Sequence, residues 1–156
     1  RACFLLLLFF CAKRKVNLII KKLNANNEVI LLEEKIVLSN LPHTWIFDLD
    51  GTLVKHNGYL TATGDVLLDG VAEFLASIPE KDMIIIVTAR PSKYRAVTEK
   101  FLSANNIRYD HIIFDVPVGE RILINDNKPS GLKTAYAIER IRDKWDKITL
   151  IEKETF

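Results

Sequence analysis

The stretch that decides the fold is Trp45-Ile46-Phe47-Asp48-Leu49-Asp50-Gly51-Thr52-Leu53-Val54. It begins with an apolar run that is typical of a buried parallel strand, and Gly51-Thr52 then indicates a sharp turn. Asp48 and Asp50 therefore stand at the C-terminal end of the strand, where open α/β sheets bind their ligands. Because side chains alternate along a strand, both carboxylates are expected on one side. A plain turn is the alternative interpretation, since Asp and Gly favour turns on their own.

Two carboxylates this close repel each other unless a cation or a shared proton lies between them. A hard divalent cation with oxygen ligands resolves the repulsion, and Mg2+ fits this role best. The pair Asp48 and Asp50 thus predicts a Mg2+ site at the end of the strand.

Apolar runs alternate with helical patterns in the rest of the chain. The predicted strands cover residues 83–87, 111–114, 121–124 and 148–151, and the predicted helices follow Asp69, Pro91 and Pro129. Asp69 is expected to cap the first helix, and the second should bury Tyr94, Val97 and Phe101. This alternation predicts a parallel sheet with helices on both faces.

Two of the downstream strands also end in polar residues. Thr88 follows one of them and would point a hydroxyl at the same crevice, while Asp126 follows another and would supply a third carboxylate. Hard cations need several oxygen ligands, and three acids on neighbouring strand ends would provide them. A helix cap or a turn is the alternative interpretation for each residue.

The segment Asp48-Leu49-Asp50-Gly51-Thr52, after an apolar strand, resembles the first motif of the haloacid dehalogenase superfamily. Thr88 resembles the second motif, whose hydroxyl binds the phosphoryl group, and Asp126 resembles the acid of the fourth motif. The resemblance covers residues 45 to 151 and implies a Rossmann-like three-layer α/β sandwich with a central, mostly parallel sheet. Residues 124–131 look like short phosphatase-like proteins of bacterial and phage polysaccharide biosynthesis.

The resemblance implies a Mg2+-dependent phosphomonoesterase with an aspartyl-phosphate intermediate. Asp48 would be the nucleophile and Asp50 the general acid/base, with Mg2+ held by Asp48, Asp50 and Asp126. A sugar phosphate is the candidate substrate. The alternatives are a phosphotransferase or phosphomutase that uses the same intermediate, and a weakly active metal-binding accessory protein of polysaccharide assembly.

The third superfamily motif is a basic residue that steadies the phosphate charge. Lys93, at the start of the helix after Thr88, is one candidate, but Lys128 and Arg121 are preferred. Lys128 lies just after Asp126, and Arg121 is the first residue of the strand predicted at residues 121–124. Arg90 would reach the substrate from its loop, because the guanidinium fork suits phosphate.

The 156 residues and the 49% apolar content suit a single folded core. The net charge of only +2 gives no argument for a nucleic-acid partner. Residues 45–156, the expected phosphatase core, contain no cysteine, which suits a reducing cytoplasm.

Residues 1–44 form a separate apolar and basic segment, with 7 Lys/Arg against 3 Asp/Glu. Its run of 11 apolar residues at 2–12 would span only ~16 Å as a helix, against a hydrocarbon core of ~30 Å. Membrane association through this run stays open. The asparagines at 24, 26 and 27 predict a turn between two short elements.

No stretch is long enough for a cap domain over the crevice. Only residues 53–68 and 91–111 could hold an insertion, and small domains need about 50 residues. An open crevice predicts a phosphorylated substrate larger than a simple metabolite, or a partner that completes the site. The sequence leaves the oligomeric state open.

Overall fold

The computed structural model describes residues 22–23, 29–30 and 34–153. The chain divides into two compact units, Arg1–Leu32 and Glu33–Phe156. In the first unit, β1 (Lys22–Leu23) and β2 (Val29–Ile30) pair antiparallel, as expected for two short elements on either side of the asparagine-rich segment. The apolar run at residues 2–12 lies outside the described residues.

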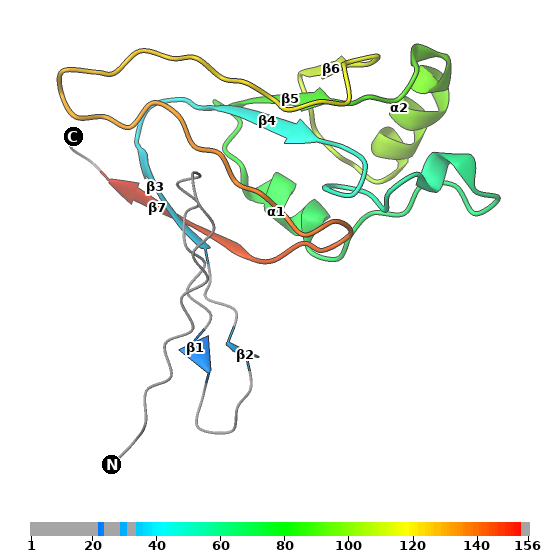
Figure 1. Ribbon diagram of the computed structural model, residues 1–156, viewed down its shortest axis with the longest axis horizontal. Helices are drawn as coiled ribbons and strands as arrows, with labels where there is room; N and C mark the ends of the chain where they lie inside the picture. The colour runs from blue at the N-terminus through cyan, green and yellow to red at the C-terminus, as the bar shows by residue number, and fades with distance from the viewer. Residues whose placement is uncertain (1–21, 24–28, 31–33, 154–156) are drawn as a thin grey trace. The chain divides into compact units, whose positions relative to one another are not determined.

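The second unit is built on a three-stranded parallel sheet (Figure 1). Its strands are β4 (Thr44–Asp48), β5 (Met83–Val87) and β6 (His111–Ile113), in that order across the sheet. All three form at predicted positions, and Asp48 pairs in register with Val87, so β4 and β5 end at the same edge. The α/β class with parallel strands is therefore confirmed.

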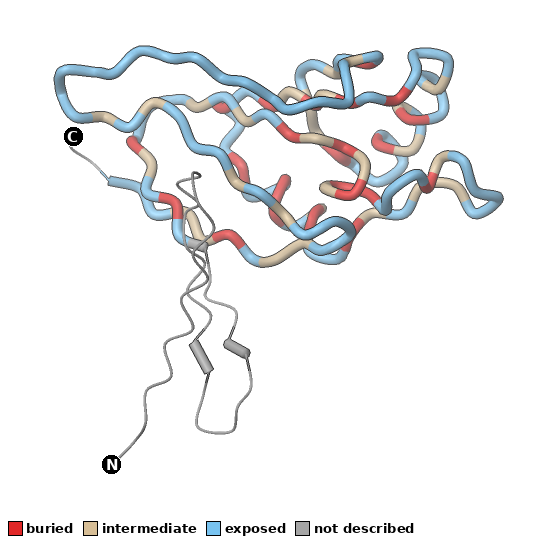
Figure 2. Tube along the Cα trace, viewed as in Figure 1, coloured by how far each residue is buried: buried red, intermediate tan, exposed pale blue. Residues whose placement is uncertain are grey.

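The two faces of this sheet differ in burial because side chains alternate along each strand. Phe47, Ile84 and Ile86 point into the core and are buried, whereas Ile46 on the other face is 56% exposed. Figure 2 shows the buried positions gathered along β4, β5 and the first helix. The open face is thus left to the irregular segment that follows β6.

Helix α1 (Val71–Ser77) connects β4 to β5 and lays Phe74 and Leu75 on the buried face of the sheet. It begins after Gly70, whose φ of 87° requires a residue without a Cβ, and no side chain caps it. The expected cap at Asp69 is therefore wrong. The helix ends before Pro79, because a residue preceding proline avoids the helical region.

Helix α2 (Arg95–Ala104) connects β5 to β6 and follows a 3-10 turn, η2 (Ser92–Tyr94). Its buried residues are Thr98 and Leu102, while Val97 is 52% exposed. Of the three residues expected to face inward, Phe101 does pack against the core and is partly buried, whereas Val97 points to solvent and Thr98 and Leu102 are the buried positions.

A second sheet pairs β3 (Glu34–Ser39) with β7 (Ile148–Lys153) in parallel. Ile36 and Ile148 bring this pair into the same hydrophobic core as the three-stranded sheet. The strand predicted at residues 148–151 therefore forms, but it pairs with β3 and not with the central sheet.

Two predicted elements are absent from the described residues between β6 and β7. Residues 121–124 form no strand, and Ile122 and Ile124 are 83% and 91% exposed. The helix expected after Pro129 is not formed either. The run contains only three apolar residues, Ile122, Leu123 and Ile124, so few apolar side chains would be buried if it joined the sheet. Helices therefore cover one face of the described sheet, and the expected helical layer on the second face is missing.

Within the described ranges of both units, no helix has the length and apolar character needed to cross a membrane.

The difference between the two faces of the sheet can be measured by mutation. Ile86→Ala should lower the free energy of unfolding by about 2–5 kcal/mol, because it opens a cavity in a fully buried position. Ile46→Ala is the matched control on the exposed face and should cost about 1 kcal/mol or less. Urea unfolding of both variants measures the difference, and equal losses would contradict the one-sided core.

Candidate active site at the carboxyl end of β4

A tight turn after β4 holds the two aspartates of the first motif. The carbonyl of Leu49 accepts hydrogen bonds from the N–H groups of Leu53 and Val54, at 2.9 and 3.1 Å. Gly51 has a φ of 85°, and a Cβ there would lie 2.9 Å from Cγ of Arg142. Glycine is therefore needed at this position both for its backbone angle and for space.

Asp48 is the exposed carboxylate of the pair. Oγ1 of Thr52 donates a hydrogen bond to its Oδ2 at 3.2 Å, and a terminal nitrogen of Arg121 lies 3.9 Å from its Oδ1. Partial burial raises the pKa of Asp48 and the negative charge of Asp50 adds to this, while Thr52 and Arg121 oppose it. With 43% of its side chain exposed, Asp48 can still meet a ligand from solvent.

Asp50 is turned inward and held by Arg90. Nε of Arg90 donates to Oδ2 of Asp50 at 2.7 Å, and NH2 donates to Oδ1 at 2.9 Å. Oγ1 of Thr88 also donates to Oδ2, at 3.4 Å. This bidentate, charge-assisted pair fixes the carboxylate more firmly than a single hydrogen bond would.

Thr88 and Arg90 thus lie where the sequence expects them, at the end of β5, but both are buried. The Thr88 hydroxyl donates to Asp50 and accepts a hydrogen bond from the backbone N–H of Arg90 at 3.2 Å. Arg90 forms a second ion pair with Asp65, whose side chain is 3% exposed. The polar groups of these two predicted phosphate-binding residues are therefore hydrogen-bonded to other residues of the protein.

Asp126 and Lys128 form a pair of their own. Nζ of Lys128 lies 2.6 Å from Oδ2 of Asp126, and both side chains are about half-exposed. The described residues contain no group of three or more His, Cys, Asp or Glu side chains that could hold a metal ion. Because residues 121–124 do not join the sheet, Asp126 does not stand at a strand end beside Asp48. Asp48, Asp50 and Asp126 are therefore not gathered into one such group, and the Mg2+ site stays a prediction.

Arg121, the other candidate for the third motif, does lie beside Asp48. Its NH1 donates to the carbonyls of Pro117 and Gly119, both at 2.8 Å, which leaves NH2 directed toward Asp48. These two bonds hold the guanidinium next to the carboxylate.

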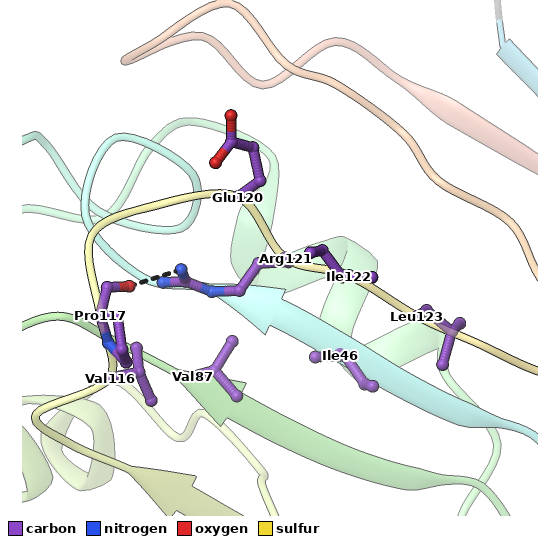
Figure 3. Close-up of a pocket in the computed structure, with 8 residues that line it drawn as sticks. All are labelled: Ile46, Val87, Val116, Pro117, Glu120, Arg121, Ile122 and Leu123. Atoms are coloured by element: carbon purple, nitrogen blue, oxygen red, sulfur yellow. Dashed lines mark hydrogen bonds between the residues drawn. The ribbon is translucent and has the colours of Figure 1, made fainter.

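Arg121 also lines a pocket of about 310 Å³, to which Asp48 does not contribute (Figure 3). Its floor is the open face of the sheet and its wall is the segment after β6. The lining side chains are mostly apolar: Ile46, Val87, Val116, Pro117, Glu120, Arg121, Ile122 and Leu123. The volume lies at the low end of the range for ligand pockets, about 300–1,000 Å³.

Asp65 is the site residue that the sequence did not indicate. It lies in the loop between the first motif and α1, far from any strand end. Its only local signal is its position after Gly64 in a glycine-containing loop, which is common in loops of all kinds.

A scan against models of protein families finds no match, and a search of curated proteins finds none either. Among solved structures, one similar chain comes from a "Structure of Pnkp1/Rnl/Hen1 complex", with 34% identity and a TM-score of 0.42 over 56% of this chain and 32% of that one. Another comes from a "Structure of the Pnkp1/Rnl/Hen1 RNA repair complex", with 30% identity and a TM-score of 0.42 over 52% and 28%. The chain thus spans less than a third of either protein chain, and at this TM-score the likeness assigns neither a family nor an activity.

Proposed function

We propose that the chain is a phosphomonoesterase whose nucleophile is Asp48. The observation that carries the proposal is the half-exposed Asp48 carboxylate at the end of β4, 3.9 Å from the guanidinium of Arg121, a residue that also lines a pocket. A carboxylate next to a cation and open to solvent can meet a phosphoryl group, whose charge Arg121 would partly neutralise. The superfamily resemblance of the first motif supports the same role.

In the first step, a carboxylate oxygen of Asp48 attacks phosphorus. The new oxygen–phosphorus bond forms as the bond to the leaving oxygen breaks, and that oxygen takes a proton from the Asp50 carboxyl. Asp50 is the nearest acid along the chain, and its negative charge acts on Asp48. In its pair with Arg90 the Asp50 side chain is a carboxylate, so it must first release one of these two hydrogen bonds and take up a proton from solvent before it can donate one.

In the second step, water attacks phosphorus of the aspartyl-phosphate and passes a proton to Asp50. The Asp48 carboxylate is released together with inorganic phosphate, which returns both residues to their starting state. The exposure of Asp48 supports hydrolysis over transfer to another acceptor, because water reaches an open carboxylate freely.

The pocket lined by Arg121 would receive the group esterified to the phosphate. Its walls of Ile46, Val87 and Leu123 favour an apolar or planar leaving group over a hydroxyl-rich one. A sugar phosphate, the class that the resemblance implies, would therefore contact this pocket with few polar partners.

The test is phosphate release by the purified chain. We expect slow hydrolysis of p-nitrophenyl phosphate, with a higher kcat/KM than for a sugar phosphate. Repeating the assay with EDTA measures the Mg2+ dependence that the resemblance implies. Absence of phosphate release from an aryl phosphate, a sugar phosphate, a nucleotide and a phosphopeptide, with Mg2+ supplied, would refute the proposed activity.

A further inference from the structure

The guanidinium of Arg90 uses all five of its N–H donors inside the protein. Nε and NH2 bind Asp50, NH1 and NH2 bind Asp65 at 2.7 and 2.6 Å, and NH1 also binds Oγ1 of Thr98 at 3.0 Å. The ring of Tyr59 covers the guanidinium, with its centroid 4.3 Å from Cζ. These bonds and contacts enclose the charge, and the Arg90 side chain is 1% exposed.

An arginine in this state has no donor left for a phosphoryl oxygen. To bind one, Arg90 would have to abandon Asp50, Asp65 or Thr98 in a buried place, which leaves a carboxylate or a hydroxyl without its partner. Arg121 faces no such obstacle, because its side chain is 43% exposed. Arg121 can therefore bind a phosphoryl oxygen, whereas Arg90 can do so only by breaking buried hydrogen bonds.

We propose that Arg90 and Asp65 are positioning residues for Asp50. This rests on the proposed function, in which Asp50 moves the proton. The Asp65 carboxylate accepts hydrogen bonds from NH1 and NH2 of Arg90. This fixes the plane in which Nε and NH2 reach the two oxygens of Asp50. Asp65 therefore acts on the reaction through Arg90, without touching the substrate.

The loop before α1 is built to deliver Asp65 to this place. The N–H of Lys55 donates to the carbonyl of Val66 at 2.9 Å, and the N–H of Leu68 donates to the carbonyl of Leu53 at 3.0 Å, which closes the base of the loop. Gly58 lies against Asp65, since a Cβ at Gly58 would be 3.2 Å from Oδ1 of Asp65. The loop is thus a support for the acid/base residue and not only a connection.

The experiment compares kcat and KM for p-nitrophenyl phosphate in Asp65→Asn and in the intact sequence. We expect kcat to fall by about 10- to 100-fold, because a small misplacement of a reacting group has effects of this size. KM should change less than about twofold, since Asp65 does not touch the substrate. Glu99→Gln is the matched control, because it removes a carboxylate from the exposed Arg95–Glu99 pair outside the site.

A double-mutant cycle tests whether Asp65 acts through Arg90. Lysine lacks the guanidinium fork, so Arg90→Lys should lower kcat as well, and Asp65→Asn should then add little further loss. Wild-type kcat in a folded Asp65→Asn protein, or two losses that multiply in full, would overturn the proposal.

Labelling with phenylglyoxal provides a readout that needs neither activity nor variants. In the unaltered chain, Arg121 should be modified well before Arg90, and inorganic phosphate should slow the modification of Arg121. If Arg90 is labelled as fast as Arg121 and is protected by phosphate, it binds the phosphoryl group and the positioning role is wrong. A chain that releases phosphate from no substrate, yet shows the expected labelling, would count against the proposed function and leave the burial of Arg90 supported.

Discussion

Replacement of Asp48 by Asn should abolish phosphatase turnover and the formation of a phosphoenzyme, with a loss of roughly 10⁴-fold or more in kcat. An amide oxygen is a poor nucleophile, so the first step has no attacking group. The fold should survive, because the side chain is 43% exposed and Asn keeps an oxygen for the Thr52 hydrogen bond. The free energy of unfolding should change by about 0.5 kcal/mol or less.

Intact-mass spectrometry after acid quenching would detect the aspartyl-phosphate in the unaltered protein and its loss in Asp48→Asn. Asp69→Asn makes the same change of charge at an exposed position that caps no helix, and it should retain full turnover. Turnover in a folded Asp48→Asn protein would mean that another group attacks phosphorus.

The strands that carry the site are those that the sequence predicts best. Residues 45–48, 83–87 and 111–113 are apolar runs bounded by turns, and each forms a strand of the parallel sheet. These predictions rest on burial, because Phe47, Ile84 and Ile86 lie in the core when their segments form strands at these positions. A strand whose own apolar side chains are buried can be predicted with little information from the rest of the chain.

The segment between β6 and β7 shows the opposite case. The run at residues 121–124 and the helical pattern after Pro129 resemble buried elements, yet Ile122 and Ile141 are exposed. Here Ile138 and Trp145 are only partly buried against the core. An apolar pattern shows that a segment can be buried. Whether it is buried depends on the surface against which it packs, and that surface cannot be predicted from the pattern.

The site was predictable at its strand ends and not in its loops. Asp48, Asp50 and Thr88 were expected together, because parallel strands end at a common edge. Arg90 was expected to face the substrate, since arginine is usually exposed and suits phosphate. Its burial depends on Asp65, from a loop whose path no periodicity predicts.

Replacement of Asp50 by Asn should lower kcat by roughly 10²- to 10⁴-fold, the usual contribution of a general acid/base. The structure also predicts what this change does to stability. Asp50, Asp65 and Arg90 together carry two negative charges and one positive charge. Asp50→Asn leaves Arg90 paired with Asp65, so the remaining buried pair is balanced and the fold should be largely retained.

Arg90→Met is the variant to set against Asp50→Asn. It leaves two carboxylates without their cation, and the loss of one partner from a buried ion pair costs about 3–5 kcal/mol. Urea unfolding should therefore show a much larger loss for Arg90→Met, while kinetics should show a large loss for Asp50→Asn in spite of its stability. If the two variants are destabilised equally, the role of Asp50 is structural. If Asp50→Asn turns over at the normal rate, the proton must come from another group, because the Asn side chain cannot supply it.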